Sequence, residues 1–142
     1  MRKQAGLIAA VALTVLAGCA GTGLRDEPGI KETFEVQADF NAAYRRAVQY
    51  VRVCHEQRAH PYGAVYVAKT AEGEKGDPNE VRMYRSTEPA KLLELIHALP
   101  SEQPGRSNVT VTVLGTGIWD RDEIAAARQS IQSATPVCRA LG

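Results

Sequence analysis

The chain contains three cysteines, the side chains best suited to covalent chemistry. A thiolate attacks electrophiles, and two thiols oxidise to a disulfide in an oxidising compartment. Cys19 lies near the start of the chain, whereas Cys54 and Cys138 lie far apart in the remainder. The surroundings of each cysteine therefore decide which reaction is expected.

The segment before Cys19 has the pattern of a secretory signal. Arg2 and Lys3 provide a positively charged start, and the run Ala5–Leu16 is apolar. This run is shorter than the ~20 residues that a spanning helix needs, and small residues follow it. The pattern predicts export and cleavage close to Cys19.

The sequence Leu16-Ala17-Gly18-Cys19 resembles the bacterial lipobox. The resemblance implies that residues up to Gly18 are a lipoprotein signal peptide, that Cys19 receives a diacylglycerol, and that its new amino group is acylated after cleavage. Each buried methylene contributes ~0.8 kcal/mol to membrane binding, so several chains would anchor the protein stably. Ala20, in place of aspartate, resembles lipoproteins sorted to the periplasmic face of the outer membrane. The alternative is a plain secretory signal with an incidental cysteine.

The rest of the chain is expected to form a tether and one domain. Residues 19–31 are rich in glycine and charge without an apolar period, which predicts a flexible tether. Residues 32–142 suffice for one modest hydrophobic core. The chain has 17 Lys and Arg against 16 Asp and Glu, and cleavage would remove two basic residues and no acid. This near-neutral balance argues against a nucleic-acid partner and leaves the membrane and an envelope protein as expected partners.

With Cys19 assigned to lipid, Cys54 and Cys138 remain as an even pair in an oxidising compartment, which predicts a disulfide. The chain-entropy model gives about 4–5 kcal/mol for a loop of this length. The alternative is a reactive thiol at Cys54 beside His55. Neighbouring residues on a helix point in different directions, so adjacency alone does not make a catalytic pair.

Hydrophobic periodicity predicts two helices, which begin at the caps Asp39 and Asp120, and five strands. The strands are expected at 32–37, 64–69, 81–86, 91–99 and 108–114. The segment 91–99 also fits a helix, but the alternation of Leu93, Leu95, His97 and Leu99 and a hairpin-like connection favour a strand.

This order, β-α-β-β-β-β-α, predicts an α+β fold with an antiparallel sheet of about five strands and two helices on one face. The order is similar to a reduced helix-grip, or START-like, architecture. The chain as a whole resembles small uncharacterised bacterial lipoproteins, and that resemblance implies no activity.

The sequence contains few signals of a reactive site. His55, His60 and His97 lack metal-ligand spacing, and the nucleophile motif Gly-x-Ser-x-Gly is missing from the sequence. We expect His55 and His60 to be solvated beyond a helix end, and Trp119 to pack in the core. The interpretation is a chain with no catalytic residue, no metal site and no cofactor.

The function predicted from these features is a structural or partner-binding lipoprotein without enzymatic activity. The alternative is a carrier of a lipid or another hydrophobic ligand, held in a cavity between the sheet and the C-terminal helix. Small residues on that helix, Ala127 and Ala134, would leave room for such a cavity.

Overall fold

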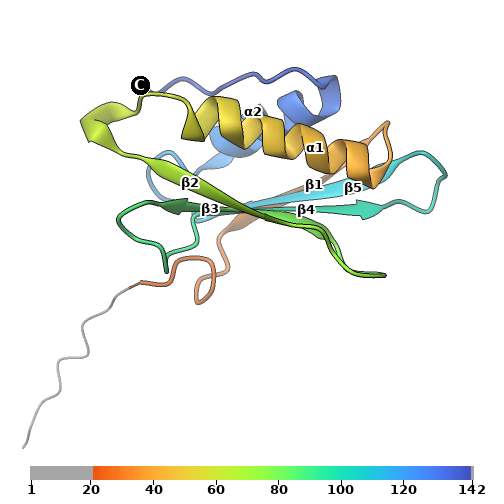
Figure 1. The fold of residues 1–142 in the computed structure, drawn as a ribbon, viewed down its shortest axis with the longest axis horizontal. Helices are drawn as coiled ribbons and strands as arrows, with labels where there is room; N and C mark the ends of the chain where they lie inside the picture. Colours follow the sequence, from red (N-terminus) through yellow and green to blue (C-terminus); the bar gives the residue numbers. More distant parts are fainter. Residues whose placement is uncertain (1–20, 142) are drawn as a thin grey trace, which may run out of the picture.

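The computed structural model describes residues 21–141, and the proposed signal peptide and Cys19 lie outside the described residues. Two helices cover one face of a single antiparallel sheet (Figure 1). The α+β class expected from the sequence is confirmed. The segment predicted as a strand at 91–99 is a strand rather than a helix, and it begins at Glu94. No helix within 21–141 is long and apolar enough to cross a membrane.

The sheet contains five strands in the spatial order β1-β5-β4-β3-β2. These are β1 (Ile30–Val36), β2 (Tyr66–Ala71), β3 (Asn79–Arg85), β4 (Glu94–Pro100) and β5 (Ser107–Val113). Strands β2 to β5 form a meander, and β1 pairs with β5 along its whole length. Because the strands are antiparallel, the ends of β3 and β5 and the starts of β2 and β4 lie at the same end of the sheet.

The helices are α1 (Phe40–Val51) and α2 (Arg121–Ser133). Each begins at an aspartate whose side chain accepts hydrogen bonds from backbone N–H groups of the first turn, as Asp39 does from Ala42 at 2.9 Å. A π-helical turn, Arg52–Glu56, continues α1, and a short 3-10 turn, Pro61–Gly63, precedes β2.

The interface between α2 and the sheet is filled. Ile124, Ala127 and Ile131 are almost fully buried and belong to the same hydrophobic cluster as Val109 and Val111 of β5. The sequence alternative placed a ligand cavity between these layers. The structure packs apolar side chains there, because two isoleucines occupy the space that the small residues of α2 leave.

The predicted tether is shorter in the structure than in the sequence interpretation. Ile30 and Lys31 belong to β1, and the Leu24 N–H donates to the Leu92 carbonyl at 2.9 Å. Gly23 allows this close approach, because it has a φ of 62° and a Cβ at this position would collide with the Leu92 carbonyl oxygen. The segment from Gly23 onward is therefore part of the domain.

The structure contains a disulfide between Cys54 and Cys138, the pair expected from the sequence. Their Cα atoms lie 5.2 Å apart. Cys54 belongs to the π-helical turn and Cys138 to the chain that returns from α2. The bond therefore joins the end of the first helical segment to the C-terminal segment.

Candidate functional site

Four polar side chains meet inside the domain, near the end of the sheet where β4 begins. Tyr50 comes from α1, His55 from the π-helical turn, Glu94 from β4 and Glu123 from the first turn of α2. At most 1 % of each residue is exposed. We call these four residues the buried cluster.

Glu123 is the centre of the buried cluster. The Tyr50 hydroxyl donates to Glu123 Oε1 at 2.6 Å, and His55 Nε2 lies 2.6 Å from the same oxygen. Glu94 Oε2 lies 3.9 Å from His55 Nε2. Burial raises the pKa of the Tyr50 hydroxyl, and the charge of Glu123 raises it further, so Tyr50 stays protonated and acts as a donor.

The π-helical turn positions His55. The Gln57 N–H bonds to the Arg52 carbonyl at 2.8 Å, five residues back, which widens the helix by one residue. π-helical turns are rare in proteins, and those that occur are often found at functional sites. The prediction of a solvated His55 is wrong, because this wider turn directs the ring into the core, where 1 % of the residue is exposed.

Glu94 occupies a core position on β4. Glu94, Ile96 and Ala98 face the helices and are buried, whereas Leu95 and Leu99 point to the open face of the sheet. The sequence analysis placed Leu95, His97 and Leu99 on one face of this strand, and in the structure that face is the open one. This register exposes leucines and buries a carboxylate, so the strand buries less apolar surface than it could. Such a departure from the usual hydrophobic pattern is typical of functional sites.

The buried cluster is short of partners for its acids. Within residues 21–141, neither oxygen of Glu94 has a hydrogen-bond donor, and Glu123 Oε2 and His55 Nδ1 are also unpaired. Burial raises the pKa of the Glu94 carboxyl well above its ordinary range, and the negative charge of Glu123 raises it further. Unpaired buried polar atoms of this kind need an explanation in the chemistry of the site.

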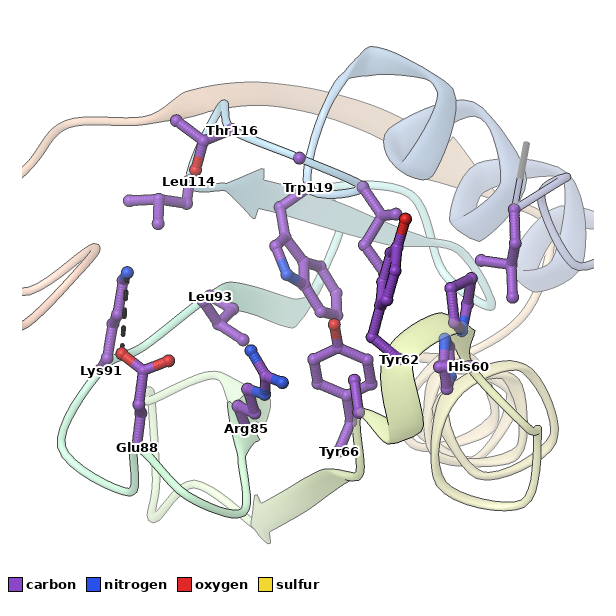
Figure 2. A pocket seen from close by; sticks show the side chains of 15 residues that line it. His60, Tyr62, Tyr66, Arg85, Glu88, Lys91, Leu93, Leu114, Thr116 and Trp119 are labelled. Atoms are coloured by element: carbon purple, nitrogen blue, oxygen red, sulfur yellow. Dashed lines mark ion pairs between the residues drawn. The ribbon is translucent and has the colours of Figure 1, made fainter.

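A cleft of about 720 Å³ opens beside the buried cluster (Figure 2). The Trp119 and Tyr66 rings line it, with centroids 5.1 Å apart. The His55 ring lies behind them, with its centroid 5.0 Å from that of Trp119 and 6.2 Å from that of Tyr66. Trp119 is buried as expected from the sequence, and its ring separates the cleft from the cluster.

The walls of the cleft combine apolar and cationic groups. Leu93 and Leu114 lie on one side, and Arg85 projects from the end of β3 (Figure 2). Lys91 pairs with Glu88 at 3.9 Å. No carboxylate of the described chain lies within 4.0 Å of the Arg85 guanidinium. Arg85 is thus a donor available to an anion.

His60 and Tyr62 border the outer part of the cleft. Burial lowers the pKa of His60, whose ring stacks on that of His55 at 5.8 Å. Tyr62 is fully exposed and has a φ of 60°, in the left-handed region that bulky residues avoid. An exposed aromatic side chain held in a strained backbone suggests a role in binding.

Comparisons with known proteins identify no family for this chain. No protein-family model matches it, and no curated protein matches it. One similar solved structure is a point mutant of norcoclaurine synthase from Thalictrum flavum, in complex with a transition-state analogue. The two chains share 11 % identity over 74 % of this chain and 91 % of the other, with a TM-score of 0.40.

The prediction that this chain lacks enzymatic activity is not kept, because one similar solved structure is that of an enzyme; no activity is carried over from that protein to this chain. The analysis of the amino-acid sequence also did not predict the buried cluster. Spacing along the chain predicted no metal site, yet the structure brings together a histidine and two glutamates that are distant in sequence. One available signal was Glu94 among alternating apolar residues, a charge where a core side chain is expected.

Proposed function

We propose that the chain is a lipoprotein anchored through Cys19 at the periplasmic side of the outer membrane, and that its domain binds a small molecule in the cleft. The ligand has an apolar or aromatic body and an anionic group. The observation that carries the proposal is Tyr62, a fully exposed and strained aromatic residue at the rim of an aromatic cleft. The sequence analysis gave ligand binding between the sheet and the C-terminal helix as an alternative; the ligand site proposed here is the cleft lined by Tyr66 and Trp119 instead.

The dimensions and lining of the cleft support this class of ligand. Small-molecule sites commonly enclose ~300–1,000 Å³ with mostly apolar walls and a few convergent polar groups, and this cleft has about 720 Å³. The Tyr66 and Trp119 rings offer flat surfaces for an aromatic or alicyclic body. Arg85 offers a planar fork of donors that matches a carboxylate or phosphate.

The binding proposal is tested with 8-anilinonaphthalene-1-sulfonate, a probe with an aromatic body and an anionic group. Arg85→Ala should weaken binding of this probe by about tenfold or more, because a charge-assisted hydrogen bond contributes ~1.5–3 kcal/mol. Arg82→Ala is the matched control on the same strand, since Arg82 pairs with Glu80 at 2.7 Å and does not line the cleft. Probe fluorescence measures both affinities.

Equal affinity of the two arginine variants would contradict the proposed cleft. Native mass spectrometry of the exported chain should in addition reveal a co-purified small anion that Arg85→Ala loses. The anchor is tested separately by labelling cells with palmitate. The label should be incorporated by the wild-type chain and lost in Cys19→Ser.

Replacing Tyr62 should separate stability from binding. Tyr62→Gly removes a side chain that buries no surface and relieves a left-handed conformation that costs about 1 kcal/mol. We expect the free energy of unfolding to rise by up to about 1 kcal/mol, while the affinity for the probe falls. Urea denaturation and probe titration of the same samples give the two values.

A loss of both stability and affinity would show that Tyr62 supports the fold rather than the ligand. Val65→Ala is a useful comparison, because Val65 is also exposed near this segment but does not line the cleft. It should leave probe affinity unchanged.

A further inference from the structure

Three side chains of the buried cluster carry atoms that bind metal ions. One ring nitrogen of His55 and one carboxylate oxygen each from Glu94 and Glu123 all lie within 4.8 Å of one another. The three residues come from a π-helical turn, a strand and a helix, so the framework of the domain holds them. Imidazole nitrogen and carboxylate oxygen together are ligands of zinc and of other divalent first-row metals.

The unpaired oxygens of Glu94 are suited to contact with a cation. Glu94 is 0 % exposed, and neither of its oxygens meets a donor in the described part of the chain. A single proton shared with Glu123 would use one Glu94 oxygen and leave the other unpaired. A dication beside His55 would contact all three groups and balance the two carboxylate charges, which are costly to bury alone.

The surroundings of these three side chains fit such a centre. Carboxylates that bind metals are usually held by outer hydrogen bonds, and the Tyr50 hydroxyl donates to Glu123 Oε1 at 2.6 Å. Trp119 and Tyr66 pack against the His55 ring on the cleft side and limit access of water. Three protein ligands leave at least one coordination position for a small molecule.

We propose that His55, Glu94 and Glu123 bind one divalent first-row transition-metal ion. This proposal does not depend on the cleft ligand, since the three metal-binding side chains lie behind the Trp119 and Tyr66 rings that line the cleft. Its test therefore needs no cleft ligand and can fail while the cleft binds its probe.

The first experiment measures stoichiometry and affinity with zinc. The exported full chain, extracted in mild detergent and stripped with EDTA, should take up one equivalent of Zn²⁺ that survives gel filtration and is counted by elemental analysis. Tyr50→Phe should weaken the affinity by about 10–100-fold, the usual effect of removing an outer hydrogen bond. Glu94→Gln and His55→Gln, which remove ligands, should weaken it by more than that.

A matched control lies on the open face of the sheet. Glu80 and His97 form a second histidine–carboxylate pair, with 3.9 Å between Glu80 Oε2 and His97 Nε2, but both are partly exposed and they belong to no group of three such side chains within residues 21–141. Glu80→Gln should therefore bind zinc as the wild-type chain does. Circular dichroism and the intact disulfide confirm that each variant is folded.

A second measurement locates the ion. Trp119 is the single tryptophan of the chain, and its ring lies 5.0 Å from that of His55. Paramagnetic Co²⁺ bound in the cluster should quench Trp119 fluorescence at one equivalent, and Zn²⁺ should reverse the quenching. Absence of stoichiometric zinc in the wild-type chain, or retention of full affinity by the folded Glu94→Gln and His55→Gln variants, would overturn the proposal.

Discussion

Replacing Cys54 and Cys138 together by alanine should lower the free energy of unfolding by about 4–5 kcal/mol. The disulfide closes a loop between residues 84 positions apart, and the chain-entropy model assigns a loop of this length that stabilisation. Small domains have unfolding free energies of about 5–15 kcal/mol, so this is a large part of the total. Pulse proteolysis in urea of the chain purified with its disulfide formed measures the loss.

Reduction of the wild-type chain provides an independent control. Incubation with a phosphine reductant should produce nearly the same loss, and it should have no further effect on the double alanine variant. A single Cys138→Ala variant should resemble the double variant, since Cys54 alone cannot form the bond. A loss below about 1 kcal/mol in all three samples would mean that the unfolded chain remains compact without the disulfide.

Glu123→Ala should destabilise the metal-free chain by about 3–5 kcal/mol. The substitution removes the acceptor of the Tyr50 hydroxyl and the partner of His55, both of which are buried, and it leaves a cavity. Removal of one member of a buried polar pair has an effect of this size, because the remaining group is desolvated without a partner. Urea denaturation in EDTA measures it without any contribution from bound metal.

The matched control for Glu123 is Glu35. Arg106 Nη1 contacts Glu35 Oε1 at 2.6 Å, the distance that separates His55 Nε2 from Glu123 Oε1, but 43 % of the Glu35 side chain is exposed. Glu35→Ala should therefore lower stability by less than about 1 kcal/mol. Similar losses in the two variants would contradict the assignment of Glu123 as the centre of a desolvated network.

Much of the fold could be predicted from hydrophobic periodicity. The alternation of valine and threonine at 108–114 predicts β5, which the structure places at Ser107–Val113. The cap at Asp120 predicts the start of α2, where its carboxylate accepts from the N–H groups of Asp122 and Glu123. These signals are local, so a single sequence is enough to reveal them.

The buried cluster could not be predicted in the same way. Its residues come from four different elements, and only the packing of both helices on the sheet brings them together. Two local signals were misleading. The regular leucines of β4 concealed the inward side of Glu94, and a period of 3.6 residues does not predict the wider turn that buries His55.

If Cys19 is acylated as proposed, the hydrogen bond between Leu24 and Leu92 limits the distance between the cleft and the membrane surface. Cys19 precedes Gly23 by four residues, which span at most about 14 Å, and Leu92 lies between Lys91 and Leu93 in the wall of the cleft. An acyl chain on Cys19 would thus keep the cleft mouth next to the phospholipid headgroups. An amphiphile could then pass from the leaflet into the protein by lateral diffusion, without crossing bulk water.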